Sequence, residues 1–472
     1  MESIWTTTVN IGERSPLKKN ISVNTAVIGG GIAGILIAWH LQQRGIETVV
    51  LEENRIGGGQ TGFTTAKITC QHNLIYDKLM QQFGAENARL YAKANLAAVT
   101  EYQKLIEQKQ IDCDFSRQPS YLFSTEKVQG VEREAQAARK LGINAGYVTW
   151  TGLPFKVKGA VKFEQQAQFH PLKFLEVLAG ELTVYEQTRV NSLEGGVSIG
   201  GEVKDRDGGK GRRVEKTKLF TNRGTVTAEH VIFACHYPFV NFPGLYFVRL
   251  HQERSYVIAL ENAAMPDGIY LGVDGDKFSL RKAGELTLLG GCSHRTGANK
   301  GGGEYGVLRE KAEQWFPGSR EVMRWSAQDC MSMDGVPYIG RFALTRPNWY
   351  VATGFNKWGM TSSMVAAQII PDLICGTENV YAPVFSPQRF RLQASIKNLL
   401  CNTWTSAAGL TKGAVSVLDN DDGITKRCPH LGCKLEWNAD ENTWECPCHG
   451  SCFEREGKKL EGPAQMDLPQ GR

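Results

Sequence analysis

Near its N-terminus the chain reads Val23-Asn-Thr-Ala-Val-Ile28 and continues Gly29-Gly-Gly31-Ile-Ala-Gly34. The first run is short and rich in β-branched residues, which predicts a buried strand. Residues 35–44 have the pattern of a helix that ends at Gly45, and residues 46–51 predict a second strand. Together these features give a G-x-G-x-x-G fingerprint its required strand–turn–helix–strand context. We therefore predict a Rossmann-like α/β domain that binds a dinucleotide.

Each glycine of this fingerprint has a physical role. Gly29 permits the tight turn, Gly31 lets a pyrophosphate approach the backbone, and Gly34 lets the helix pack closely on the strand. The helix N-terminus directs free N–H groups and the positive end of its dipole at the phosphates. Glu52, at the end of the second strand, is placed to accept hydrogen bonds from the ribose hydroxyls. The fingerprint alone fits NAD or FAD, but its position at the start of a long chain is more typical of FAD enzymes.

A second informative stretch lies near the C-terminus. It reads Cys428-Pro-His430-Leu-Gly-Cys433 and later Cys446-Pro-Cys448-His449-Gly-Ser-Cys-Phe453. Two thiolates can hold one iron of a [2Fe-2S] cluster while two imidazoles hold the other. A structural zinc site is the alternative, but the one-residue gap of a Cys-x-His pair fits the usual zinc spacings poorly.

Both Cys-His pairs closely resemble the ligand loops of Rieske domains. The resemblance implies that the cluster ligands are Cys428, His430, Cys446 and His449. It places the two histidines at the exposed tip of the domain, where electrons would leave. We therefore expect a Rieske [2Fe-2S] centre.

The resemblance also implies details around the cluster. Cys433 and Cys448 stand where respiratory-type Rieske domains join their loops by a disulfide, a bond that is unusual in the cytosol. Ser451 resembles the serine that donates a hydrogen bond to a bridging sulfide, which raises the potential. Phe453 stands where high-potential members have tyrosine. We therefore predict a reduction potential within the range of about −150 to +300 mV and below its upper limit.

Three further segments resemble the D-amino-acid oxidase/glycine oxidase superfamily of FAD-dependent oxidoreductases, typified by DadA-like dehydrogenases. They are the glycine- and hydroxyl-rich run 56–67 and the segments 333–340 and 351–361. The resemblance implies that the first segment follows the flavin and its pyrophosphate. It implies that the other two border the isoalloxazine, where a helix dipole stabilises negative charge on reduction. Beyond the fingerprint, the residues expected to contact FAD are Thr61, Gly62, Thr65, Ala66, Val190, Gly335, Gly354, Asn356, Trp358, Gly359, Met360 and Thr361.

The same resemblance places the substrate beside the strands at 254–256 and 278–281. An arginine there commonly binds a substrate carboxylate through its planar fork, which makes Arg281 the first candidate. Tyr256 and His294 are further candidates on the substrate side. The alternative for Arg281 is a surface ion pair.

The composition of the chain limits the classes of protein that it fits. Of its 472 residues, 42% are hydrophobic and 22% are charged, which is ordinary for a globular protein. A formal net charge of +5 is small for this length and gives no case for nucleic-acid binding. The sequence indicates neither a signal peptide nor a transmembrane segment, so we expect a cytoplasmic protein.

We expect three parts along the chain. Residues 1–385 form the FAD-dependent oxidoreductase, with a mixed-sheet substrate domain inserted around 115–165 and 240–330. Prolines mark the boundary after it, and residues 386–404 predict a linker helix. Residues 405–472 predict a small all-β Rieske domain that lacks its last strand. This order of domains resembles the YhfW-type family.

The two predicted cofactors differ in the number of electrons that they transfer at a time. A flavin takes two electrons as a hydride from a C–H beside an amine, whereas the cluster passes electrons singly to an external acceptor. We therefore predict a dehydrogenase of an amino acid or other amine. The alternative is an electron-transfer or redox-sensing protein whose flavin is reduced by a partner. A Rieske oxygenase is not supported, because no 2-His-1-carboxylate iron site stands out in the sequence.

Overall fold

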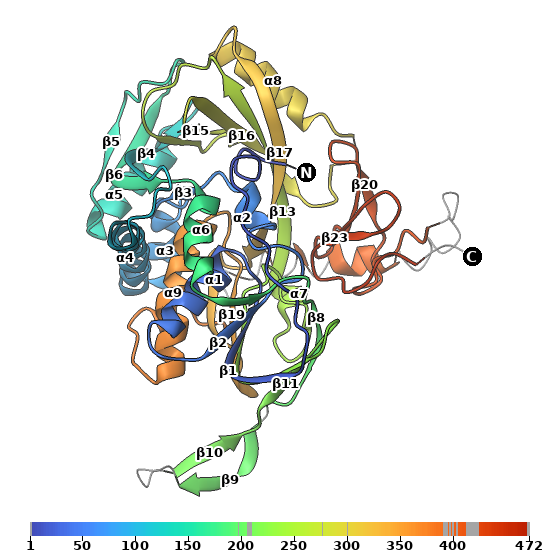
Figure 1. The fold of residues 1–472 in the computed structure, drawn as a ribbon. Helices are drawn as coiled ribbons and strands as arrows, with labels where there is room; N and C mark the ends of the chain where they lie inside the picture. Colours follow the sequence, from blue (N-terminus) through green and yellow to red (C-terminus); the bar gives the residue numbers. More distant parts are fainter. Residues whose placement is uncertain are drawn as a thin grey trace.

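The computed structural model describes residues 2–389 except 197, 205–209, 276 and 300, together with 395, 398, 401–402, 405–411 and 424–469. Four sheets, of eight, nine, four and two strands, carry the fold (Figure 1). This confirms the predicted class, an α/β protein with a mixed-sheet domain and a small all-β domain. Within the described ranges, none of the helices combines the length and the apolar character that a membrane crossing requires.

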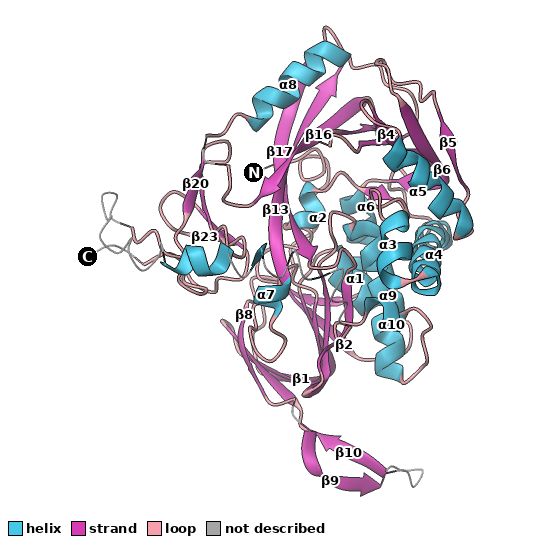
Figure 2. Ribbon diagram, turned by 180° about the vertical axis from the view of Figure 1, so that it is seen from behind, coloured by secondary structure: helices cyan, strands magenta, loops and turns pink. Residues whose placement is uncertain are grey.

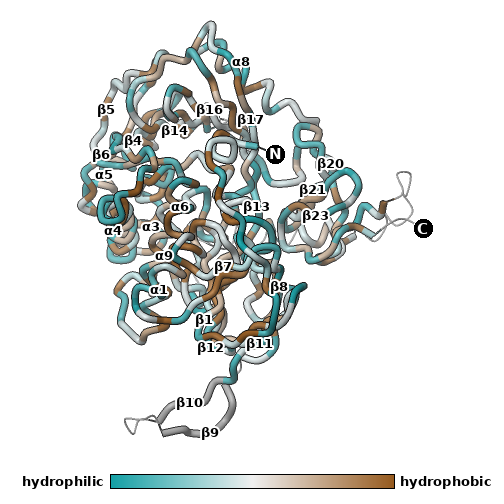
Figure 3. Tube along the Cα trace, in the orientation of Figure 1, coloured by the Kyte–Doolittle hydropathy of each residue, from teal (hydrophilic) through white to brown (hydrophobic). Residues whose placement is uncertain are grey.

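The eight-stranded sheet is built around the predicted nucleotide fold. Its central strand β1 (Ile21–Ile28) lies between β2 (Thr48–Leu51) and β12 (Thr225–Phe233) and runs parallel to both. Helix α1 (Ile32–Gln42) follows β1 and packs against α9 (Gly359–Cys375). Covered strands of a parallel sheet need apolar residues on both faces, and Figure 3 shows hydrophobic residues gathered along β1 and β12. The remaining strands are β7 (Thr183–Tyr185), β8 (Val190–Glu194), β11 (Thr217–Thr221), β18 (Tyr338–Ala343) and β19 (Arg346–Thr353).

The nine-stranded sheet stands above the first and forms the second large layer (Figures 1 and 2). Two long antiparallel strands, β13 (Leu250–Glu261) and β17 (Arg320–Ser332), form one edge of this sheet. Its other strands are β3 (Lys67–Ile68), β4 (Ser116–Ser124), β5 (Ala145–Val148), β6 (Gly159–Gln168), β14 (Ile269–Gly272), β15 (Ser279–Ala283) and β16 (Leu286–Arg295).

Helices join and cover these two sheets. The longest is α4 (Ala85–Lys109), which follows α3 (Tyr76–Phe83) after a break at Gly84. The others are α2 (Gln60–Phe63), α5 (Gln129–Lys140), α6 (Pro171–Gly180), α7 (Tyr246–Arg249), α8 (Glu304–Trp315) and α10 (Ala382–Phe385). The hairpin of β9 (Ser198–Lys204) and β10 (Lys210–Val214) projects away from the body of the molecule (Figure 1).

The C-terminal domain packs beside β13 and α7 (Figure 2). Its antiparallel sheet has the strands β20 (Glu436–Asn438), β21 (Thr443–Glu445), β22 (Cys452–Phe453) and β23 (Lys459–Glu461). Residues 405–411, which precede it, are helical. Most of the predicted linker helix at 386–404 lies outside the described residues.

Candidate functional site

A cavity of about 1300 Å³ extends between the two large sheets. It is lined by eleven of the residues predicted to contact FAD, which are Gly29, Gly31, Glu52, Thr61, Thr65, Val190, Gly335, Asn356, Trp358, Gly359 and Met360. The other five predicted residues do not line the cavity; they are Gly34, Gly62, Ala66, Gly354 and Thr361. The C-terminal domain closes part of the cavity through a segment that includes Cys452, Lys459 and Glu461.

The fingerprint turn has the close backbone contacts that its glycines predict. A Cβ atom added to Gly34 would lie 1.9 Å from the carbonyl oxygen of Gly29, and one added to Gly29 would lie 2.6 Å from that of Ala234. The hydroxyl of Thr61 accepts a hydrogen bond of 3.0 Å from the backbone N–H of Ile32, at the start of α1. The turn and the start of α1 line the cavity at Gly29, Gly31 and Ala33, where a bound pyrophosphate would contact them.

Glu52 lies at the nucleotide end of the cavity. Its carboxylate accepts hydrogen bonds from the backbone N–H groups of Gly30, at 2.6 Å, and Asn54, at 2.8 Å. Burial raises the pKa of Glu52 to about 7, although these two hydrogen bonds act in the opposite direction. The carboxylate is therefore held rigidly beside the glycine turn.

Asn356 ties the second predicted flavin-bordering segment to Ser332, the residue just before the first. Its side-chain oxygen accepts a hydrogen bond from the backbone N–H of Ser332, at 2.8 Å, and its amide donates one to the carbonyl of Gly354. Asn356 and Gly354 both have positive φ angles, 52° and 69°. This turn holds the N-terminus of α9 against the cavity.

His72 also belongs to this end of the cavity, and the sequence analysis did not select it. Its ring stacks on Trp358 with a centroid distance of 4.9 Å, and its Nδ1 lies 2.6 Å from the hydroxyl of Tyr91. Burial lowers the pKa of His72 to about 3, so the imidazole is neutral. His72 lies five residues beyond the run 56–67 and belongs to no motif, so the sequence gives no signal for this position.

The structure does not support the predicted substrate-side role of Arg281. Its guanidinium is buried below the cavity wall, where it donates hydrogen bonds to the carbonyls of Thr65, at 2.8 Å, and Ala66, at 2.6 Å. Arg281 forms no ion pair with the residues that the structure describes, and its Nη1 is occupied by these two carbonyls. Arg281 instead supports the backbone of the predicted flavin-contacting segment.

Tyr256 and His294 are engaged with each other. The Tyr256 hydroxyl lies 3.1 Å from Nε2 of His294 and accepts a hydrogen bond from Asn438 of the C-terminal domain. Tyr256 lines the cavity, whereas His294 does not. Sequence reasoning could not find this arrangement, because it depends on how the two domains dock.

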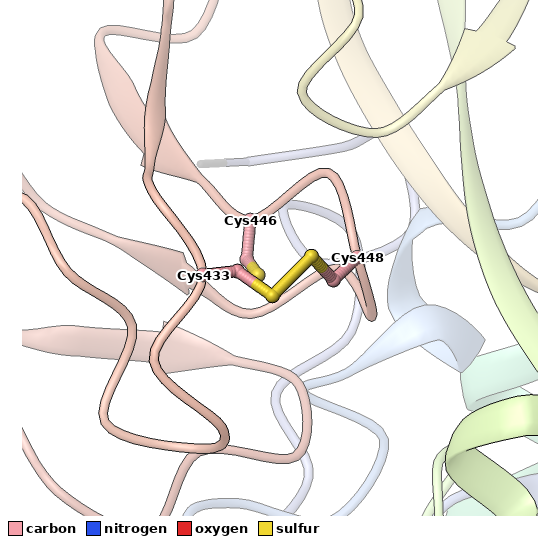
Figure 4. Close-up of side chains that lie close together, drawn as sticks. All are labelled: Cys433, Cys446 and Cys448. Atoms are coloured by element: carbon pink, nitrogen blue, oxygen red, sulfur yellow. A yellow bond between two sulfur atoms is a disulfide. The ribbon is translucent and has the colours of Figure 1, made fainter. Parts of the chain in front are cut away.

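The predicted disulfide between Cys433 and Cys448 is present and joins the two ligand loops (Figure 4). Cys446 lies beside it, so that the three sulfur atoms are all within 4.8 Å of one another. Two of these sulfurs are bonded to each other, so the three cysteines do not form a metal-ligand set. Cys446 instead lies within hydrogen-bonding reach of the thiol of Cys428.

The two predicted histidine ligands complete this set. The rings of His430 and His449 lie 4.9 Å apart and almost perpendicular to each other. Among the described residues, the Nδ1 atom of each ring is buried without a hydrogen-bond partner, and so is Nε2 of His449. Buried polar atoms without a partner are costly, so two thiols and two free imidazole nitrogens in one place fit a [2Fe-2S] cluster.

The prediction that these histidines lie at an exposed tip is wrong for His449, while His430 is half-buried. His449 is 1% exposed, and its ring contacts Tyr237 and Phe247 of the large domain. Nε2 of His430 lies 2.9 Å from the side-chain oxygen of Asn241. The tip is covered because the C-terminal domain docks with this face against the cavity-bearing domain.

Side chains of the large domain hold the backbone of the second ligand loop. Gln252 donates a hydrogen bond of 2.9 Å to the carbonyl of His449, and Gln328 donates one of 2.7 Å to that of Gly450. Arg295 donates a hydrogen bond of 2.9 Å to the carbonyl of Pro447. These bonds fix the orientation of the loop relative to β13, β16 and β17.

Comparison with known proteins agrees with both halves of the architecture. The model of the FAD dependent oxidoreductase family matches residues 24–373, and that of the Rieske [2Fe-2S] domain matches residues 416–471. The Rieske 2Fe-2S iron-sulfur protein YhfW of Bacillus subtilis is 34% identical over 511 residues, which covers 99% of this chain and 97% of that protein. The gamma-glutamylputrescine oxidoreductase of Escherichia coli is 22% identical over 396 residues, covering 76% of this chain and 85% of that enzyme.

Among solved structures, the glycine oxidase of Geobacillus kaustophilus has the same fold in its large domain. It superposes with a TM-score of 0.62 at 18% identity, and the match covers 78% of this chain and 99% of the oxidase. The match to the Rieske model favours the cluster over zinc at the Cys-His loops.

Proposed function

The chain belongs to the family of FAD-dependent oxidoreductases and ends in a Rieske [2Fe-2S] domain, and on this premise we propose that it oxidises an amino acid or other amine and passes the electrons one at a time to an external acceptor. Its cofactors are FAD and a [2Fe-2S] cluster. When bound, FAD accepts two electrons from a C–H beside an amine, and the cluster carries one electron at a time. The cytoplasmic location expected from the sequence stays a prediction.

Each cofactor has a group of residues that would hold it. For FAD these are the fingerprint glycines and Glu52 at the nucleotide end, and the turns around Gly335 and Asn356 at the flavin end. For the cluster they are Cys428, Cys446, His430 and His449. His72 and Trp358 form a neutral aromatic wall, which would keep water from the flavin end.

The proposed order of electron transfer, from flavin to cluster, rests on one observation. The histidine side of the cluster site is buried against the domain that bears the cavity, through His449 and the Asn241–His430 contact. This supports the cluster as the acceptor of electrons from the flavin, because the ligands face the flavoprotein and not the solvent. Electrons would then leave from another side of the Rieske domain, to a partner of unknown identity.

Anaerobic rapid mixing of the holoprotein with a panel of amino acids and amines tests this proposal. We expect at least one of them to bleach the flavin, followed by the paramagnetic signal of the reduced cluster. In Cys446→Ser, which cannot complete the ligand set, the substrate should still bleach the flavin without that later signal. Bleaching by NAD(P)H and a reductase, but by no small amine, would instead identify a protein whose flavin is reduced by a partner.

A further inference from the structure

Asp329, on β17, has a free carboxylate that lines the cavity. In the register of the sheet it lies directly opposite Glu253 on β13. Side chains that lie opposite each other on antiparallel strands share one face of the sheet, with Cβ atoms roughly 5 Å apart. Glu253 also lines the cavity, so two carboxylates stand side by side on its wall.

Only one of these two carboxylates has a cationic partner. Glu253 lies 3.0 Å from the ammonium of Lys357 and 3.6 Å from Nε2 of His251. Lys357 is held there by a further hydrogen bond of 3.0 Å to the hydroxyl of Ser255. The carboxylate of Asp329 has no hydrogen bond or ion pair to any residue that the structure describes. A partly buried carboxylate without a partner is costly, so this position favours a cationic ligand.

The groups that face Asp329 come from four different elements. They are Glu253 on β13, Lys357 after β19, His236 after β12 and Glu461 on β23 of the Rieske domain. Burial and the two neighbouring acids raise its pKa, while Lys357 and His236 act in the opposite direction. The carboxylate is thus a better proton acceptor than an exposed aspartate.

Asp329 also lies near the expected flavin edge. Ser332, three residues further along β17, is bound by Asn356 in the turn that precedes α9. Lys357, the next residue after Asn356, reaches back to Glu253. The carboxylate pair and the flavin-bordering turn therefore belong to one connected part of the cavity wall.

We propose that Asp329 binds the ammonium group of the substrate and accepts its proton. The N–H bond of the ammonium breaks, the proton moves to the Asp329 carboxylate, and the nitrogen regains its lone pair. The amine is then neutral, so that a hydride can leave the neighbouring carbon for bound FAD, and the product is an iminium ion. The inference rests on the proposed function and narrows its substrate to a primary or secondary amine that arrives protonated.

The binding of an amine that cannot be oxidised can be measured without any catalysis, and so tests this inference by itself. tert-Butylammonium has no hydrogen on the carbon beside its nitrogen, so it reports on binding alone. In calorimetric titrations of the FAD-loaded protein, Asp329→Asn should weaken its binding about tenfold or more, as loss of a charge-assisted hydrogen bond does. Asp329→Glu should restore much of the binding. Glu456→Gln removes an exposed acid at the rim of the same cavity and should leave the binding unchanged.

A second readout follows flavin reduction by a reactive amine as a function of pH. In the wild type the rate should fall at low pH, where Asp329 is protonated. In Asp329→Asn the rise should move to higher pH, because the amine must then arrive neutral. If amines reduce the flavin but Asp329→Asn matches the wild type in both the titration and the pH profile, the inference is overturned. If no amine reduces the flavin and the cation still binds through Asp329, the proposed function fails and the binding site stands.

Discussion

The guanidinium of Arg254 on β13 lies 2.6 Å from the carboxylate of Glu445 on β21, and both side chains are almost completely buried. The same guanidinium lies 3.1 Å from Glu461 on β23. One side chain of the large domain therefore pairs with two strands of the Rieske domain. Because this pair is enclosed, its charges are screened little by solvent. Removal of one partner leaves the other charge buried, with nothing to compensate for its lost hydration.

We expect Glu445→Gln to loosen the docking of the Rieske domain. Removal of one partner of a buried pair typically costs about 3–5 kcal/mol. Thermal melting of the holoprotein and limited proteolysis between the domains would measure the effect. The control is Glu321→Gln, which breaks a pair with the half-exposed Arg309 and should change little. Equal effects of the two variants would show that the buried pair does not hold the domains together.

Gly34→Ala should abolish FAD binding. The added methyl group would lie 1.9 Å from the carbonyl of Gly29, so the turn and α1 must move apart. The ratio of flavin absorbance to protein absorbance after purification is the readout. Gly180→Ala at the end of α6, where nothing lies within 4 Å of the added atom, is the matched control and should keep its flavin. A yellow Gly34→Ala protein would contradict the fingerprint assignment.

Removal of the Cys433–Cys448 disulfide should destabilise the Rieske domain. The bond links residues that are 15 apart in the sequence, and closure of a loop of this length is worth about 3 kcal/mol in the chain-entropy model. The double variant Cys433→Ser/Cys448→Ser should therefore lose its cluster absorbance at a lower temperature. Cys375→Ser, which removes an exposed free thiol, should not. Mass spectrometry of the alkylated wild type would show directly whether the bond forms in cells.

The lowered pKa of Lys67 predicts that the free energy of unfolding depends on pH. Its ammonium lines the cavity, and burial, together with the nearby charge of Arg281, lowers its pKa from 10.5 to about 7. The unfolded chain therefore binds more protons than the folded protein between pH 7 and 10.5, so the stability contribution of Lys67 rises with pH over that window. Lys67→Met should raise the melting temperature most below pH 7, and the gain should shrink toward pH 10.5. A gain that does not vary with pH would show that Lys67 keeps its ordinary pKa.

The sequence predicted those features that depend on local backbone chemistry. The fingerprint around Gly29 and Gly34 requires the strand–turn–helix unit wherever it occurs, because side chains at these positions would collide with the backbone. The pairing of Cys433 with Cys448 is implied by the resemblance of the two Cys-His loops to the ligand loops of Rieske domains. The fold class and the disulfide could therefore be predicted and are confirmed.

The features that failed depend on contacts between distant segments. The resemblance makes Arg281 a candidate ligand of a substrate carboxylate, but residues more than two hundred positions away supply the carbonyls that it binds. His449 looked like an exposed ligand, but docking against Phe247 and Gln252 buries it. Asp329 has no motif around it, and its position opposite Glu253 appears only once β13 and β17 pair.

The contact between His430 and Asn241 should set part of the cluster's reduction potential. Nε2 of His430 lies 2.9 Å from the side-chain oxygen of Asn241, so this nitrogen is placed to donate its proton while Nδ1 is free to bind iron. An acceptor at the outer nitrogen makes the imidazole a stronger electron donor, which stabilises the oxidised cluster. We therefore expect Asn241→Leu to raise the potential measured by voltammetry. The wild-type value should lie within about −150 to +300 mV and below the upper limit, since Phe453 provides no hydroxyl. Phe453→Tyr should raise it as well, by a hydrogen bond on the other side of the cluster. An unchanged potential in cluster-loaded Asn241→Leu would show that the histidine does not donate to Asn241 when iron is bound.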